Sequence, residues 1–451
     1  MAVAVIDALA AGLPADALTT DPDVIEGYRR DRAMTAEPGT PVALVRPADT
    51  AQVQTTMRIA TAHGVPVVPR GAGTGLSGGA TAVEGAITLS TERLRHCEID
   101  PTSMLAVVGP GLFNAEVKAA AAAHGLWYPP DPSSFEICSI GGNLATNAGG
   151  LCCVKYGVTT DYVLGLEVVL ADGSLVRLGG RTIKDVAGLD LKRLFVGSEG
   201  TLGIITGATL RLRPAAPAVD TVVATFAGVA DAGRAVARVV GEVRPSALEL
   251  MDRAAVAAVE RVRPMGLDAD IGALLLAQGE GGSAESARIA TACEEAGATY
   301  VAVSADPEQG EMLMAARRMA IPCVERLGTV MIEDVGVPVP RIPELLERVA
   351  GISERHTTAI PVIGHAGDGN FHPLVTFDPQ DAEAAARARV AFDEVMDAAL
   401  DLGGTVTGEH GVGTLKTRHL EAQVGPEVMA LSRRIKQALD PDGILNPGKW
   451  L

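Results

Sequence analysis

The sequence predicts an α+β protein built from two domains. Its 451 residues, 47% of them hydrophobic, are sufficient for two or three domains with cores of their own. Strand-like and helix-like segments occur in both halves of the chain. A connector rich in proline and alanine, residues 213–218, separates the halves and is typical of a domain boundary.

The first half is predicted to be rich in strands. After an irregular start, a helix is expected at 51–63, where Gly64 ends it. Apolar and β-branched runs predict short strands at 65–69, 86–90 and 105–109.

A second helix and a pair of strands complete this half. Asn114 is expected to cap the helix, which runs to His124. Residues 165–178 place two strand-like runs on either side of Asp172-Gly173, and this pattern predicts two strands joined by a tight turn.

The second half alternates helical and strand-like runs. Helical patterns occupy 230–242, 283–296, 340–355 and 381–402. Strand patterns occupy 273–278, 299–304 and 329–335. Residues 362–375 are predicted to form two strands around a turn, and 426–439 a last helix.

Charge and composition exclude several classes of protein. A formal net charge of −17 gives no general attraction to nucleic acid or to an anionic membrane. No uncharged apolar run is long enough to span a membrane, and the N-terminus lacks the features of a secretory signal. The six cysteines have no CxxC spacing, which argues against an iron–sulfur cluster or zinc ribbon. We therefore expect a cytoplasmic protein with reduced thiols.

A glycine-rich loop, Arg70–Gly79, is the first candidate binding site. Its GxGxxG pattern predicts a dinucleotide site of the Rossmann type only if a helix follows. The residues that follow, 80–89, read instead as a strand, so NAD is not expected. A loop whose bare N–H groups converge on a pyrophosphate remains, beside the simpler interpretation of a flexible hairpin.

Two further clusters of small residues favour the first interpretation. One covers Pro129–Ser134 and Ser139–Gly150, and the other covers Gly197–Ile205. Three such loops in one domain indicate a long ligand that lies against the backbone.

Histidines form the second candidate site. His365 and His372 flank a predicted turn, and a short loop can bring two imidazoles to one divalent ion. Glu409 and His410 are adjacent among glycines, which permit close approach of a ligand. Each of these residues also has a simpler interpretation, as a hydrogen-bonded core histidine, a turn or a polar loop.

From residue 38 to its end the chain resembles the vanillyl-alcohol-oxidase/p-cresol-methylhydroxylase superfamily. The segments that carry the resemblance are the glycine-rich loop, Pro129–Ser134, Gly141–Gly150 and Asn446–Lys449. It is most similar to the branch that contains glycolate oxidase, D-lactate dehydrogenase and D-2-hydroxyglutarate dehydrogenase.

The resemblance implies an FAD-binding domain of this type in two parts, with a second α+β substrate domain. The implied divisions are an N-terminal extension at 1–37, the FAD-binding domain at 38–214, the substrate domain at 219–415, and a segment that returns to the FAD-binding domain at 416–451.

The resemblance implies FAD-binding residues in the glycine-rich loop, in the two other clusters of small residues and in the C-terminal motif. They are Arg70, Gly71, Ala72, Gly73, Thr74, Gly75, Ser77, Pro130, Asp131, Ser134, Gly141, Gly142, Asn143, Thr146, Asn147, Gly149, Gly150, Gly200, Gly203, Ile204, Ile205 and Asn446. Relatives that hold FAD covalently do so through a histidine or cysteine of the first loop. None occurs between Gly64 and Thr91, so we expect noncovalent FAD.

The same resemblance implies a metal-assisted oxidation of a small D-2-hydroxy acid. His365, His372 and Glu409 would hold a divalent metal, often assigned as zinc in the family, with iron and manganese left open. His410 would be the base, and Arg317, rather than Arg318, would pair with the substrate carboxylate. A solvated helix face is the simpler interpretation of this arginine pair.

Substrate, partners and competing functions stay open at this point. Ile321 and Ile332 stand where 2-hydroxyglutarate enzymes carry an added polar and basic pair, which favours glycolate or D-lactate. An electron-acceptor protein, a quinone and oligomerisation are all compatible with the sequence. The alternatives are a flavin-dependent non-redox transferase of the alkyl-dihydroxyacetone-phosphate synthase type and a noncatalytic FAD-binding protein.

Overall fold

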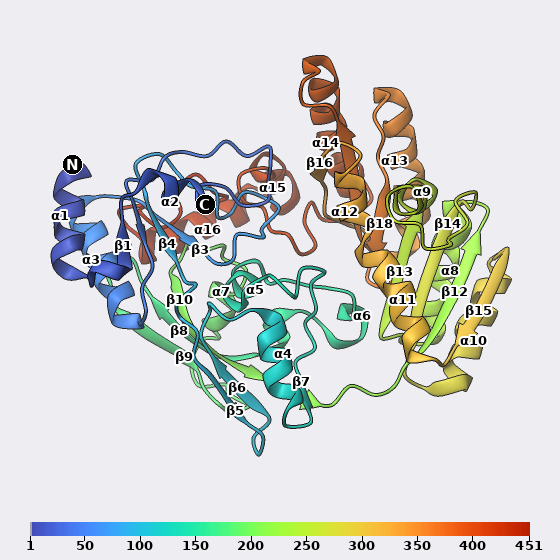
Figure 1. Ribbon diagram of the computed structural model, residues 1–451, viewed down its shortest axis with the longest axis horizontal. Helices are drawn as coiled ribbons and strands as arrows, with labels where there is room; N and C mark the ends of the chain where they lie inside the picture. Colours follow the sequence, from blue (N-terminus) through green and yellow to red (C-terminus); the bar gives the residue numbers. More distant parts are fainter. Residues whose placement is uncertain (1) are drawn as a thin grey trace. The chain divides into compact units, whose positions relative to one another are not determined.

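The computed structural model describes residues 2–451 and divides into two compact units (Figure 1). The first unit comprises the chain up to Gly149, Val158–Ala216 and Glu409–Leu451. The second unit comprises Gly150–Gly157 and Pro217–Gly408. Both units mix helices and sheets, which confirms the α+β class.

Two sheets and a short strand pair form the frame of the first unit. One sheet has the order β1 (Leu18–Thr19), β2 (Ala43–Val45), β4 (Ile87–Ser90), β3 (Val67–Arg70). The other is antiparallel, in the order β5 (Cys97–Asp100), β6 (Leu105–Val108), β10 (Ile204–Arg211), β8 (Val163–Val169), β9 (Leu175–Gly179). β7 (Leu126–Trp127) pairs with β11 (Arg213–Pro214). Strands β2, β4 and β3 run parallel and are largely buried, as parallel strands usually are.

Local caps set both ends of one helix of this unit. Helix α3 (Thr50–His63) begins after Asp49, whose carboxylate accepts the Gln52 N–H, and Gly64 ends it at φ 62°. Further helices are α4 (Asn114–Ala122), α5 (Ile140–Thr146), α7 (Lys192–Phe195), α15 (Thr417–Val424) and α16 (Pro426–Leu439).

The prediction of an irregular N-terminus is wrong. Residues Ala2–Gly12 form helix α1, and Pro22–Glu26 form α2. Val5 and Leu9, one helical turn apart, are fully buried in the core that also contains residues of α3. This alanine-rich, largely apolar segment becomes a helix because α3 packs against it and covers its apolar face.

Two expectations within 114–146 also need correction. Phe113 occupies the N-cap of α4 and Asn114 is its first helical residue, with its side chain turned to Pro130 and Asn143. The segment after Ser139 is helix α5 rather than a loop. The Ser139 hydroxyl accepts the Gly142 N–H, and such a cap allows a helix in spite of two glycines.

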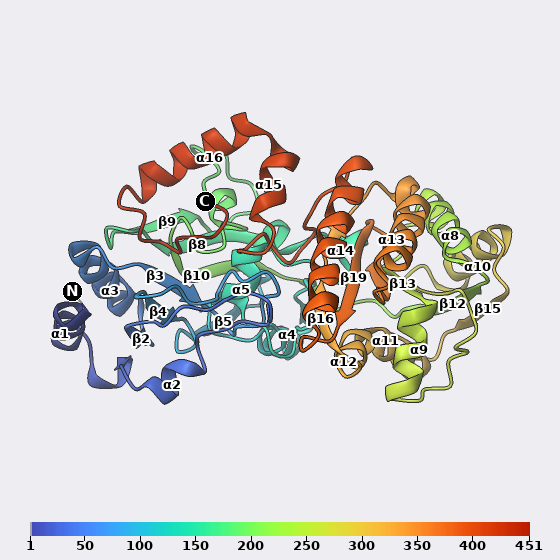
Figure 2. The same cartoon turned by 90° about the horizontal axis from the view of Figure 1, so that it is seen from above.

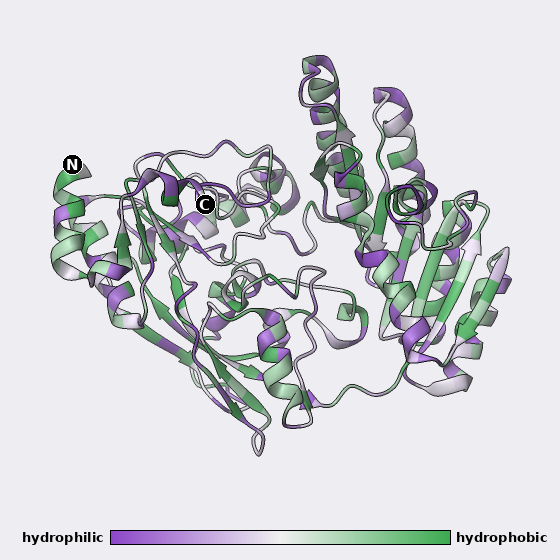
Figure 3. Cartoon of the chain, in the orientation of Figure 1, coloured by the Kyte–Doolittle hydropathy of each residue, from purple (hydrophilic) through white to green (hydrophobic). Residues whose placement is uncertain are grey.

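A single antiparallel sheet organises the second unit. Its order is β15 (Tyr300–Ser304), β12 (Asp220–Phe226), β14 (Ala273–Gly279), β13 (Ala247–Asp252), β18 (Val362–His365), β19 (Asn370–Phe377), β16 (Thr329–Ile332), and β17 (Val335–Gly336) also pairs with β19. Strand residues are mostly apolar in Figure 3.

Helices cover both faces of this sheet, as Figure 2 shows. One face carries α8 (Val229–Glu242), α10 (Gly282–Glu295), α13 (Ile342–His356) and α14 (Ala382–Asp401). The other carries α9 (Arg253–Val262), α11 (Pro307–Arg318) and α12 (Ala320–Glu325), while α6 (Cys153–Tyr156) contacts β13. Among the described residues, no helix has the length and apolarity needed to cross a membrane.

The C-terminus adds to the parallel sheet of the first unit. The Val67 N–H donates to the Ile444 carbonyl, and the Asn446 N–H donates to the Val67 carbonyl. Leu445 therefore lies beside β3 in a parallel bridge. This pairing places Asn446 directly next to the strand that leads into the glycine-rich loop.

Candidate functional site

The glycine-rich loop after β3 contacts the capped start of α5. The Ser139 hydroxyl accepts the Ala72 N–H at 3.1 Å and the Gly142 N–H at 3.2 Å. A Cβ on Gly71 would lie 2.4 Å from the same hydroxyl oxygen. Glycine at position 71 is therefore required by the approach of the second small-residue segment.

The third small-residue segment and the C-terminal motif join the first two. The N–H of Glu199 donates to the Ala145 carbonyl at 2.8 Å, at the end of α5. The Asn446 amide donates to the carbonyls of Gly79 and Glu199, at 3.0 and 2.7 Å. Segments that are far apart in the sequence are thus tied together mainly through backbone groups.

The buried side-chain amide of Asn114 connects Pro130 with Asn143 of α5. The Asn114 side chain donates to the Pro130 carbonyl at 3.1 Å and to the Asn143 side chain at 3.0 Å. The structure therefore brings the Pro129–Ser134 segment, which includes Asp131 and Ser134, against α5.

The glycines among the predicted FAD-binding residues are of two kinds. At Gly73, Gly141 and Gly200 an added Cβ would come within 3 Å of Arg70, Pro110 and Pro69, respectively. At Gly75 and Gly142 an added Cβ would meet only ordinary contacts, at 3.5 and 3.4 Å. At Gly141 and Gly200 the obstructing atoms belong to prolines, so internal packing requires glycine, whereas at Gly73 they belong to the flexible end of Arg70. The second kind leaves bare backbone beside open space, which fits a cofactor held against the main chain.

The remaining predicted cofactor residues have varied surroundings. Ile204 is buried in the apolar core, Ile205 is partly exposed, and Gly203 contacts Val168. The Thr146 hydroxyl donates to the Gly142 carbonyl, and the Asn147 side chain accepts the Thr160 N–H. Thr74 is partly exposed in its loop, and the division between the units passes between Gly149 and Gly150.

The two histidines of the second candidate site lie on one face of a hairpin. His365 ends β18 and His372 lies on β19, where it pairs with Ile363, so both side chains project to the same side. Their ring centroids are 5.3 Å apart and both residues are buried. Glu409, the third predicted ligand, directly follows Gly408, the last residue of the second unit.

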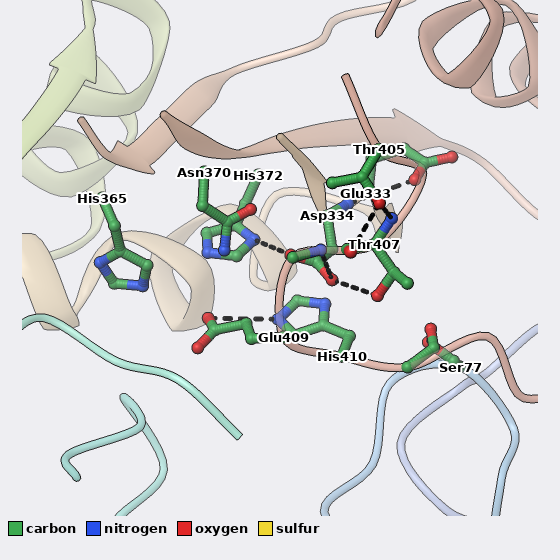
Figure 4. A network of polar contacts seen from close by, with 12 residues as sticks. Ser77, Glu333, Asp334, His365, Asn370, His372, Thr405, Thr407, Glu409 and His410 are labelled. Carbon is green, nitrogen blue, oxygen red and sulfur yellow. Dashed lines mark hydrogen bonds and ion pairs between the residues drawn. The ribbon is translucent and has the colours of Figure 1, made fainter. Parts of the chain in front are cut away.

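Buried carboxylates lie behind both imidazoles, and neither was predicted from the sequence. Glu249 on β13 pairs across the sheet with His365, and its two oxygens lie 2.8 and 3.0 Å from His365 Nδ1. Asp334 Oδ1 lies 3.7 Å from His372 Nδ1 (Figure 4). The signal for Glu249 was present, because it is an acidic residue inside the apolar run Ala247–Met251.

Asp334 owes its position to a break in the sheet. The strand expected at 329–335 divides into β16 and β17, with Glu333 and Asp334 between them. The Glu333 N–H donates to the carbonyl of Pro373, a residue that has no N–H to return. Asp334 then accepts the Thr407 hydroxyl at 2.7 Å and the Gly408 N–H at 2.9 Å, and so holds the segment that leads to Glu409.

His410 is the next residue along, and its Nε2 lies 3.8 Å from Glu409. His410 therefore lies next to one of the three predicted ligands.

Glu199 and Ser77 hold the chain just after His410. The Glu199 carboxylate accepts the N–H groups of Val412 and Gly413, both at 2.8 Å. The Ser77 hydroxyl donates to the Gly411 carbonyl at 2.7 Å. Burial raises the pKa of Glu199 to about 7, against the opposing effect of these two N–H groups. Glu199 was also missed, because an acidic residue in a glycine-rich turn reads as an exposed one.

Arg317 lies at the end of α11 with 2% of its surface exposed, and its Nε is 3.0 Å from Glu249 Oε2. Arg318, by contrast, pairs with the exposed Glu311. The simple interpretation of a solvated helix face therefore fits Arg318 and does not fit Arg317.

Two imidazoles and a carboxylate are a donor set that zinc and other first-row divalent ions accept. Three protein ligands leave coordination positions for a substrate, as catalytic metal sites do. The donor chemistry of His365, His372 and Glu409 thus fits a divalent ion.

Two family models match the chain. The model described as "FAD binding domain" matches residues 41–179, and the one described as "FAD linked oxidases, C-terminal domain" matches residues 215–450.

Curated relatives are similar over most of their length. The glycolate oxidase subunit GlcD of Bacillus subtilis (strain 168) is 39% identical over 91% of this chain and 88% of its own. Its namesake from Escherichia coli (strain K12) is 37% identical over 96% and 87%. A D-lactate dehydrogenase of Archaeoglobus fulgidus is 37% identical over 90% of each.

Solved structures share the fold. p-Cresol methylhydroxylase with bound substrate has a TM-score of 0.83 at 18% identity, covering 99% of this chain and 96% of that one. An alkyldihydroxyacetonephosphate synthase has a TM-score of 0.76 at 18% identity, covering 99% and 84%. The predicted fold type and FAD as the cofactor are confirmed. The chain is an FAD-dependent oxidoreductase and belongs to the family of FAD-linked oxidases.

Proposed function

We propose that the protein oxidises a small D-2-hydroxy acid to the 2-oxo acid, with noncovalent FAD as hydride acceptor and a divalent metal at His365, His372 and Glu409. The carrying observation is that His365 and His372 lie buried on one face of a hairpin, with ring centroids 5.3 Å apart. Relatives named glycolate oxidase and D-lactate dehydrogenase support a 2-hydroxy acid as the substrate.

Each proposed residue has one task. When bound, FAD supplies the acceptor for the hydride on Cα, and a divalent ion supplies a Lewis acid that lowers the pKa of the substrate hydroxyl. His365, His372 and Glu409 fix the position at which the hydroxyl and carboxylate of the acid can bind together. Holding the reacting C–H bond in one orientation removes much of the entropic cost of the reaction.

His410 is the proposed base. A neutral imidazole can take the hydroxyl proton as the hydride leaves, so that the substrate loses one proton and one hydride, two hydrogens and two electrons in all, in a single oxidation. Its position next to Glu409 supports this role.

Arg317 is the proposed cation for the substrate carboxylate, because a guanidinium matches a carboxylate in shape and charge. Its burial at the end of α11, near the Glu249–His365 pair, supports this choice over Arg318. Zinc is the proposed metal, and glycolate and D-lactate are the favoured substrates.

The test is anaerobic mixing of purified protein with glycolate, D-lactate, D-2-hydroxyglutarate and, as a stereochemical control, L-lactate. Flavin absorbance is followed before chelator treatment, after it, and after zinc, iron or manganese is restored. We expect bleaching by glycolate or by a D-acid, lost with chelator and regained with one metal.

Protein that retains FAD and metal but is bleached by none of these acids would contradict the proposed oxidation. The transferase that shares the fold would then be tested next.

A further inference from the structure

We propose that Glu249 is a positioning residue that fixes the tautomer of His365, so that Nε2 of this imidazole is the atom offered to the metal. The inference rests on the metal site of the proposed function and assigns a role to a residue outside the ligand set. It also gives Arg317 a second role, as the charge that keeps Glu249 in place.

Strand register places Glu249 and His365 side by side. They are direct cross-strand partners in β13 and β18, a pairing that brings side chains of one face into contact. Both Glu249 oxygens lie at hydrogen-bond distance from His365 Nδ1, at 2.8 and 3.0 Å. Glu249 is 1% exposed, so water does not compete for this contact.

The chemistry of the pair dictates the tautomer. An ionised carboxylate only accepts hydrogen bonds, so His365 Nδ1 must carry the proton. The lone pair of a neutral imidazole is then on Nε2, and this is the atom that can bind a metal. A carboxylate behind a metal-binding histidine also makes the imidazole a better donor.

Arg317 gives the Glu249 carboxylate a cationic partner inside an apolar strand. A buried carboxylate without a partner is costly, and its flanking residues Leu248 and Leu250 are fully buried. Arg317 Nε lies 3.0 Å from Glu249 Oε2, and both residues are almost fully buried. The order Arg317, Glu249, His365 is thus a line of alternating partners that ends at the proposed metal.

The experiment measures zinc affinity of the FAD-loaded protein by competition with a chromophoric chelator. Glu249→Leu removes the acceptor, and Glu249→Gln keeps one acceptor oxygen but removes the charge. We expect zinc to bind about 10- to 100-fold more weakly in Glu249→Leu, with a smaller loss in Glu249→Gln. The gain in Tm on adding zinc should fall in the same order.

Asp252→Asn is the matched control. Asp252 lies on the same strand, three residues away, and its carboxylate caps α9 through the Ala255 N–H. Asparagine keeps this cap, so we expect zinc affinity equal to that of the wild type. His365→Ala shows the affinity that remains when the ligand itself is lost.

Glu249→Leu leaves Arg317 buried without its partner and can misfold for that reason. The double variant Glu249→Leu/Arg317→Met removes both charges and should show the same loss of zinc affinity.

The tautomer of His365 can be measured directly. Long-range proton–nitrogen NMR spectra of the wild-type protein with nitrogen-labelled histidine report the tautomer of each of its eight histidines. We expect His365, assigned by its absence in His365→Ala, to be protonated at Nδ1 both without and with zinc.

The outcomes distinguish the role of Glu249 from the existence of the metal site. Wild-type zinc affinity in the Glu249 variants, combined with its loss in His365→Ala, would overturn the role of Glu249 and leave the metal site intact. A proton on Nε2 of His365 would do the same. No binding of any divalent metal by the wild type would overturn the proposed metal site, and the role of Glu249 with it.

Discussion

The two candidate sites are built in opposite ways. In the first unit, the segments around the glycine-rich loop meet at main-chain groups, such as the Ala145 carbonyl, which accepts the Glu199 N–H, and the Gly79 carbonyl, which accepts the Asn446 side-chain amide. In the second unit, the donor group of His365 and His372 is supported by side chains, Glu249 behind one ring and Asp334 near the other.

This difference decides which substitutions each site tolerates. A site made of backbone depends on residues that have no side chain, so it fails when a Cβ is added. A site made of side chains depends on partners that are distant in sequence, so it fails when a donor or acceptor is removed. The four predictions below test this contrast, from the largest effect to the smallest.

His410→Ala should slow the reduction of flavin by the 2-hydroxy acid about 10²- to 10⁴-fold, because a general base contributes this much. FAD and zinc content should remain at wild-type levels, since His410 is in neither predicted ligand set. The measurement is single-turnover flavin reduction, with His124→Ala, an exposed histidine, as the control. An unchanged rate would remove His410 from the proposed mechanism.

Glu199 should make the stability of the first unit depend on pH. Burial raises its pKa to about 7 from 4.5, so its contribution to stability is complete below 4.5 and is lost as the pH rises through 7. Between pH 5 and pH 8 the free energy of unfolding should fall relative to that of Glu199→Gln, by up to about 3 kcal/mol.

Urea unfolding followed by tryptophan fluorescence measures this, because both tryptophans, Trp127 and Trp450, belong to the first unit. The exposed Glu136, replaced in Glu136→Gln, supplies the control. A difference between wild type and Glu199→Gln that stays constant with pH would contradict the raised pKa.

Gly200→Ala and Gly85→Ala separate crowding from backbone strain. Both glycines have positive φ, 71° and 72°, and alanine at either should cost about 1 kcal/mol. At Gly200 the added Cβ would also lie 2.3 Å from Pro69 Cγ, whereas at Gly85 nothing lies within 4 Å. Gly200→Ala should therefore cost about 1–3 kcal/mol more and lose FAD, while zinc binding persists. Equal unfolding free energies and FAD contents in the two variants would show that Pro69 does not crowd a Cβ at position 200.

Ser77→Ala should have the smallest effect, about 1 kcal/mol, because it removes the hydrogen bond from Ser77 to the Gly411 carbonyl. The Ser77 carbonyl would still accept the Thr414 N–H and preserve the turn. Urea unfolding compared with Ser133→Ala, at an exposed serine, measures the loss. A loss of several kcal/mol would mean that this side chain, and not the backbone, holds the segment.

The sequence by itself determined the fold type, the cofactor and the elements with a local signal. Helix α3 ends at Gly64 and the β8–β9 turn lies at Asp172-Gly173, because caps and tight turns depend on a few adjacent residues. The positions of His365 and His372 on one hairpin were predictable for the same reason.

Tertiary structure alone decided what depends on distant partners. Helix α1 exists because α3 covers its apolar face, and the break between β16 and β17 exists because Pro373 lies opposite. Glu249 and Glu199 acquire their roles from strand register and from loop closure, which join residues 116 and 213 positions apart. The sequence names the residues proposed to do the chemistry, and the packing of strands and loops decides which carboxylates lie beside them.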